Sequence, residues 1–124
     1  MSKMFLPTVS DIPRIGSATP LYATSVGNNV TLYCDVVSEL AVTSVYWEFI
    51  AYGTTETSVI TTANDSRHTG GTLQEESLTI SNVSFTDVGI YKCVAVNKAG
   101  IGTGPNIELD VTTTVLGNLN ILLY

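Results

Sequence analysis

The chain has 124 residues, of which 44% are hydrophobic, so it is long enough for one domain with a full core and short appendages. Its 11 acidic residues outnumber its 5 basic residues, which gives a formal net charge of −6. Because the basic residues are few and unclustered, the composition argues against nucleic-acid binding. The acidic balance also disfavours adsorption to anionic lipid.

The two ends of the sequence lack the regular pattern of its middle, and they are expected to be tails. No stretch has the length and apolar character of a membrane span, so we expect no direct membrane insertion. The first residues also lack the apolar run of a secretory signal. We expect an N-terminal tail at 1–19 with room for a first strand near Pro7–Ser10, one folded domain at 20–112, and an apolar C-terminal tail at 113–124.

Short runs of alternating apolar and polar residues recur along the chain, separated by Gly-, Asn- and Ser-rich stretches. This period of two predicts short strands, and no helical pattern competes with it. The expected strands are Leu21–Ser25, Val30–Cys34, Val45–Ile50, Thr57–Thr61, one within Asn64–Thr72, Glu76–Ser81, Gly89–Asn97 and Ile107–Val111. The expected turns are Tyr52–Thr54, Gly70–Gly71 and Gly100–Gly104. The pattern therefore predicts an all-β sandwich.

Two cysteines, Cys34 and Cys93, enclose the single tryptophan, Trp47, and Cys93 ends the phrase D-V-G-I-Y-K-C at Asp87–Cys93. In these residues the chain resembles the immunoglobulin superfamily. The phrase A-V-N-K-A-G at Ala95–Gly100 is similar to the intermediate, or I-set, subtype of that superfamily. The resemblance implies an immunoglobulin-like Greek-key β-sandwich with one disulfide between its sheets.

The resemblance also implies roles for individual residues. It pairs Cys34 with Cys93, makes Tyr91 the tyrosine corner and joins Arg67 to Asp87 in a salt bridge. The residues that it implies for the core are Trp47, Tyr91, Leu78 and Leu32. The segment between Trp47 and Cys93 is long for the I-set subtype, which leaves open a short additional strand, as in variable-type domains.

A disulfide indicates an oxidising compartment, so we expect an extracellular location, on a cell surface or in secreted form. Three N-glycosylation sequons agree with this expectation, at Asn29, Asn64 and Asn82. The same tripeptide is frequent by chance in Ser- and Thr-rich chains. The three asparagines are therefore candidate acceptors in a predicted glycoprotein.

The sequence offers little for catalysis, and we expect no enzyme, no cofactor and no metal site. Its single histidine, His68, lies in a polar stretch and is interpreted as a solvated residue. Glu75 and Glu76 are adjacent, so on a strand they point to opposite faces and do not converge on a substrate or metal ion. The glycines of Gly100–Gly104 lack the Lys-Ser/Thr and helix of a phosphate loop.

The remaining candidate is a surface. If Trp47 and Cys93 face the core, the alternate residues of their two strands face solvent, and these strands are neighbours in the expected fold. The candidate protein-binding residues are Tyr46, Glu48, Ile50, Lys92, Val94 and Val96. An apolar patch with charged neighbours is typical of a protein interface, although strands favour such residues for propensity alone.

The leading hypothesis is an extracellular recognition module for cell adhesion or receptor-type contact with a protein partner, including homophilic contact that forms a homodimer. An alternative is soluble or surface immune recognition of microbial or glycan ligands, through loops near Glu39–Thr43 and Ile101–Pro105. A third class is one repeat of an intracellular filament protein, in which the cysteines are reduced.

Overall fold

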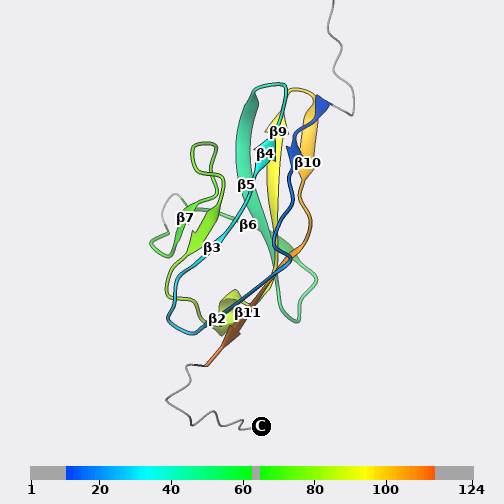
Figure 1. Ribbon diagram of the computed structural model, residues 1–124. Coiled ribbons are helices and arrows are strands. Elements are labelled where there is room, and N and C mark those ends of the chain that lie inside the picture. Colours follow the sequence, from blue (N-terminus) through cyan, green and yellow to red (C-terminus); the bar gives the residue numbers. More distant parts are fainter. Residues whose placement is uncertain (1–10, 63–64, 114–124) are drawn as a thin grey trace, which may run out of the picture.

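The computed structural model describes residues 11–62 and 65–113, which form a sandwich of β-sheets (Figure 1). The larger sheet has the strand order β2-β11-β9-β5-β6, with β10 paired to β9. Its strands are β2 (Leu21–Ser25), β5 (Val42–Ala51), β6 (Thr57–Ile60), β9 (Gly89–Asn97), β10 (Gly100–Thr103) and β11 (Ile107–Thr112). Opposite it lie the sheet β3-β8-β7 and the pair β1-β4, formed by β1 (Arg14–Ile15), β3 (Val30–Leu32), β4 (Val36–Val37), β7 (His68–Gly70) and β8 (Leu78–Ile80).

The long antiparallel pair β5 and β9 forms the centre of the larger sheet, and it sets the register of Trp47 opposite Cys93. The N-terminal part of the chain contributes to both layers. Strand β1 pairs with β4, whereas β2 runs parallel to β11 in the larger sheet. In the described part of the chain, no helix has the length and apolar character needed to cross a membrane.

The core lies between the layers and is built around the disulfide between Cys34 and Cys93. Closing a loop with a sequence separation of 59 contributes roughly 4 kcal/mol by the chain-entropy estimate. Trp47 is buried beside this bond, and its Nε1–H donates to the carbonyl of Glu76 at 2.8 Å. The expected core residues Leu32, Leu78 and Tyr91 are buried in the same cluster.

The 3-10 helix η2 (Phe85–Asp87) closes one end of the core. The Tyr91 hydroxyl donates to the carbonyl of Asp87 at 2.6 Å, which is the arrangement of a tyrosine corner. The carboxylate of Asp87 accepts from the backbone N–H of Ser84 at 2.9 Å and forms an ion pair with Arg67. Burial, followed by the nearby Asp87 carboxylate, raises the pKa of Tyr91 above its ordinary value.

The turn after β9 comes earlier than the sequence predicts. Gly100–Gly104 was expected as a turn, but most of it is strand β10, which pairs with β9 so that Gly100 lies opposite Asn97. The cause is the side chain of Asn97, whose Oδ1 accepts from the backbone N–H groups of Ala99 at 2.8 Å and Gly100 at 3.2 Å. The chain therefore reverses over Lys98 and Ala99.

Residues 11–19 contribute to the sandwich. Pro13 is fully buried, and Ile15 packs against the core cluster. The backbone carbonyl of Pro13 lies so close to Gly102 that a Cβ atom there would stand 1.8 Å from its oxygen. A domain boundary at residue 20 stays a prediction, and these contacts favour an earlier one. The first strand expected near Pro7–Ser10 and most of the C-terminal tail lie outside the described residues.

Between β6 and β7 the described residues, 61–62 and 65–67, contain no strand. The additional strand left open by the sequence is therefore absent from these positions. The turn expected at Gly70–Gly71 comes slightly later: both glycines have positive φ angles, of 75° and 64°, but Gly70 ends β7 opposite Leu78, and the chain reverses where the N–H of Thr72 donates to the carbonyl of Glu75 at 2.9 Å.

Candidate recognition face of the larger sheet

The surface of the larger sheet that points away from the core, called the outer face below, follows from the alternation of side chains. Along β5, β9 and β11 the core takes every second residue, including Trp47, Cys93 and Leu109. The intervening side chains form the outer face. Its members on these three strands include Tyr46, Glu48, Ile50, Ile90, Lys92, Val94, Val96, Glu108, Asp110 and Thr112.

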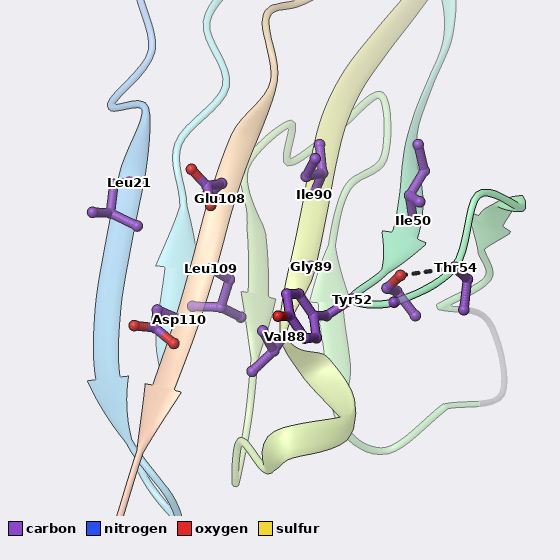
Figure 2. Close-up of a pocket in the computed structure, with 12 residues that line it drawn as sticks. Leu21, Ile50, Tyr52, Thr54, Val88, Gly89, Ile90, Glu108, Leu109 and Asp110 are labelled. Carbon is purple, nitrogen blue, oxygen red and sulfur yellow. Dashed lines mark hydrogen bonds between the residues drawn. The ribbon is translucent and has the colours of Figure 1, made fainter.

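The pairing register arranges these residues in transverse rows. One row crosses four neighbouring strands as Leu21, Glu108, Ile90 and Ile50, each directly opposite the next (Figure 2). A second row places Lys92 opposite Glu48, which in turn lies opposite Val59 of β6. A third places Val94 between Tyr46 and Thr103. The outer face therefore mixes apolar side chains with a few charges.

Five of the six residues predicted for this face are at least partly accessible to solvent: Tyr46, Glu48, Ile50, Lys92 and Val96. Val94 was predicted to be accessible too, and this was wrong, because only 1% of it is exposed. Val94 is absent from the core cluster, so its side chain is covered by neighbours on the outer face. Its neighbours Tyr46 and Thr103 flank it from the two adjacent strands.

Sequence reasoning missed several residues of the outer face. Leu21 is 53% exposed, Val59 and Ile101 are each 57% exposed, and Tyr52 in the turn after β5 is 83% exposed. The period of two, extended to the ends of the strands, would have found Ile90, Glu108 and Asp110. No such signal identifies Leu21, because its neighbour Glu108 comes from the far end of the chain.

The outer surface of the opposite sheet has a different character. Its central row is Thr31, Thr79 and Thr69, and the hydroxyls of Thr31 and Thr79 are hydrogen-bonded at 2.8 Å. Tyr33, which follows β3, is an exposed aromatic residue on this side. Hydroxyl groups are well solvated, so this row gains little from a partner, in contrast to Leu21, Val59 and Ile101.

Two of the three candidate glycosylation sites lie together at one end of the smaller sheet. Asn29 and Asn82 are both exposed, and Oδ1 of Asn29 accepts from the backbone N–H of Asn82 at 3.0 Å. Asn82 has a φ of 53°, a left-handed conformation that asparagine tolerates better than most residues. Both asparagines therefore have structural reasons to be there, and their glycosylation stays a prediction. Asn64 lies outside the described residues.

The predicted solvated histidine, His68, is partly buried at the start of β7, and its Nδ1 lies 2.6 Å from Oδ2 of Asp65. The backbone N–H of Arg67, followed by the His68 ring, holds the pKa of the Asp65 carboxyl below its usual range. Of the adjacent glutamates, Glu76 accepts from the backbone N–H of Val36 at 3.3 Å. The described residues contain no group of three or more side chains suited to hold a metal ion.

Comparison with known proteins agrees with this architecture. A family model described as immunoglobulin domain matches residues 13–97. The tandem Ig repeats of Dlar are similar with a TM-score of 0.64 and 24% identity, over 84% of this chain and 48% of that one. The N-terminal Ig1-2 module of the Drosophila receptor protein tyrosine phosphatase DLAR gives 0.60 and 25%, over 82% and 46%. The chain thus spans about half of each structure, and no curated protein matches it.

Proposed function

Because the chain belongs to the immunoglobulin domain family, whose domains are generally binding modules without catalysis, we propose that it is an extracellular recognition module for cell adhesion or receptor-type contact between proteins. The observation that carries the proposal is the asymmetry of its two outer surfaces. The larger sheet exposes three aliphatic residues, Leu21, Val59 and Ile101, whereas the smaller sheet presents a central row of threonines followed by the exposed Tyr33. Several exposed aliphatic side chains on one face favour its burial against a partner.

A homophilic contact is the finer form of this proposal. Glu48 and Lys92 lie opposite each other on the outer face. The ion pairs in which both residues are described are Arg67–Asp87 and Asp65–His68, and neither includes Glu48 or Lys92. A two-fold interface through this face would let Glu48 of each copy meet Lys92 of the other.

The test compares matched substitutions on the two surfaces. Val59→Glu and Ile101→Glu place a charge on the outer face, and Tyr33→Glu places one on the smaller sheet at a similarly exposed residue. The domain, clustered on beads, is assayed against itself and against an array of extracellular protein domains, and sedimentation gives its oligomeric state. We expect the first two variants to lose binding and Tyr33→Glu to retain it. The reverse result would place recognition on the smaller sheet.

Immune recognition through loops is a second class of function, with microbial or glycan ligands. Its expected loop segments are partly strand, because Val42 and Thr43 belong to β5 and Ile101–Thr103 to β10. The reversal at Lys98 and Ala99 is correspondingly tight. These positions favour the sheet over the loops. The natural chain and the Val59→Glu variant are therefore also tested on an array of microbial polysaccharides. Equal binding of both proteins to a polysaccharide would support recognition through loops.

The extracellular location and the filament alternative are separated by the state of the cysteines. Cys34 and Cys93 are joined by a disulfide in the folded domain. On protein isolated from its natural source, we expect a thiol-alkylating reagent to add no mass before reduction and two adducts after it. Alkylation without reduction would favour an intracellular location, where thiols are kept reduced.

A further inference from the structure

A hollow of about 500 Å³ lies on the outer face, where the row of Leu21, Glu108, Ile90 and Ile50 meets the turn after β5 (Figure 2). Its floor carries Ile90 and Ile50 from adjacent strands, and Leu21 stands at its far side on β2. Aliphatic side chains from three separate strands therefore converge on one depression. This is the concave, apolar arrangement that receives a side chain of a partner.

The wall formed by the turn is held in place by hydrogen bonds. The backbone N–H of Tyr52 donates to the carbonyl of Val88 at 2.9 Å, and Oγ1 of Thr54 donates to the carbonyl of Ala51 at 2.8 Å. The side chain of Tyr52 is nevertheless 83% exposed. An exposed tyrosine on a fixed backbone loses little conformational entropy on binding, and tyrosine is enriched among residues that dominate interface energies.

The charge of the hollow is one-sided. Glu108 and Asp110 are both exposed and lie two residues apart on β11, so they point to the same side of the sheet. The described residues that line the hollow include these two acids and no lysine or arginine. Glu108 stands between Leu21 and Ile90, so a partner that covers these side chains also excludes water from the carboxylate and strengthens its interaction with a cation.

We propose that this hollow binds a basic and apolar segment of a different protein, which places an arginine on Glu108 and an adjacent apolar side chain on Ile50 and Ile90. The inference rests on the proposed recognition role of the outer face. Arginine fits because its aliphatic stem can lie along Leu21 while its planar guanidinium donates two hydrogen bonds to the carboxylate. Lysine offers the charge without the fork.

Charge complementarity favours such a partner over a second copy of the chain. The chain has a formal net charge of −6. Glu108 and Asp110 line the hollow, whereas Lys92, which lies opposite Glu48, does not. Two copies meeting at the hollow would bring the same acidic surplus together, and like charges across an interface are unfavourable.

The probe is a phage-displayed library of random peptides selected on the whole chain. Selected peptides are synthesised and their affinities measured for the natural chain, for the double variant Glu108→Gln with Asp110→Asn, and for Glu75→Gln. The double variant removes two exposed charges with little change of shape, so its folding is preserved. We expect peptides that pair an arginine or lysine with an apolar neighbour, and an affinity about tenfold lower for the double variant. Glu75→Gln serves as the matched control, because it removes an exposed charge between β7 and β8, away from the outer face, and it should bind normally.

Peptides without basic residues, undiminished binding to the double variant, or an absence of enriched peptides would overturn the assignment of the hollow. If the chain dimerises and the double variant does not, the occupant of the hollow is a second copy of the chain, and the proposed basic partner is overturned. If Ile101→Glu loses binding and the double variant keeps it, the assignment of the hollow is overturned, but the recognition role of the outer face is retained. Binding lost only in Tyr33→Glu would overturn both.

Discussion

Gly71 lies against the indole ring of Trp47, so closely that a Cβ atom at this position would stand 2.9 Å from Cδ1 of the ring. The backbone of Gly71 also has a φ of 64°, in the left-handed region. Both features exclude a larger residue, for steric and for conformational reasons. Gly71, in the segment between β7 and β8, is therefore part of the packing of the core tryptophan.

Gly71→Ala should accordingly lower the free energy of unfolding by about 2–4 kcal/mol, from left-handed strain together with overpacking against Trp47. Gly53→Ala is the matched control. Its φ is 84° but no atom lies within 4 Å of the added Cβ, so it carries the strain alone, about 1 kcal/mol. Urea denaturation of the two variants measures the cost of left-handed strain alone and the cost of strain together with overpacking. Equal losses would show that the ring of Trp47 moves aside at no cost.

The carboxylate of Asp87 joins two parts of the core edge, since it pairs with Arg67 and accepts from the backbone of Ser84. Asp87→Asn should cost about 2 kcal/mol of stability, because it removes the charge-assisted hydrogen bond from the partly exposed Arg67 and weakens the cap of η2. Ser84→Ala removes only the hydroxyl that accepts from the backbone N–H of Thr86, and about 1 kcal/mol is expected. Thermal denaturation at neutral pH compares them, and a smaller loss in Asp87→Asn than in Ser84→Ala would contradict this account.

The fold was predictable because its signals are local and redundant. The period of two placed Trp47, Tyr91 and Cys93 on one side of their strands, and the resemblance named the disulfide that joins the sheets. A slip of one residue would have exposed the tryptophan, so the register followed from burial alone. For the same reason the alternation correctly assigned Tyr46, Glu48 and Ile50 to the outer face.

The errors have a different cause, since each depends on contacts that the alternation within one strand does not contain. Val94 loses its exposure to neighbours on β5 and β10, which the sequence of β9 does not contain. Gly100–Gly104 has the composition of a turn, and it becomes a strand because Asn97 reverses the chain early. The hollow needs Leu21 beside Glu108, a parallel pairing between the two ends of the domain. No local pattern reports such a pairing.

The buried phenol of Tyr91 predicts that the stability of the domain depends on pH in the alkaline range. Its pKa is raised in the folded state above the ordinary value of 10.0, so the stability linked to it is fully present below pH 10.0 and is lost as pH rises through the folded pKa. Tyr91→Phe should remove this part of the alkaline loss and cost about 1 kcal/mol at neutral pH, because the bond to Asp87 disappears. Urea denaturation from neutral to alkaline pH measures both effects. Tyr33→Phe, at the surface, is the control and should keep the slope of the natural chain.

Residues 11–19 should be required for full stability, although the sequence suggested a tail. The carbonyl of Asp11 accepts from Nδ2 of Asn97 at 2.8 Å, and Pro13 is fully buried next to Gly102. A chain of residues 20–113 loses this bond to a buried amide and uncovers the core beneath Pro13 and Ile15. We expect it to be at least about 3 kcal/mol less stable in urea than a chain of residues 11–113. Equal stability of the two chains would place the domain boundary at residue 20 after all.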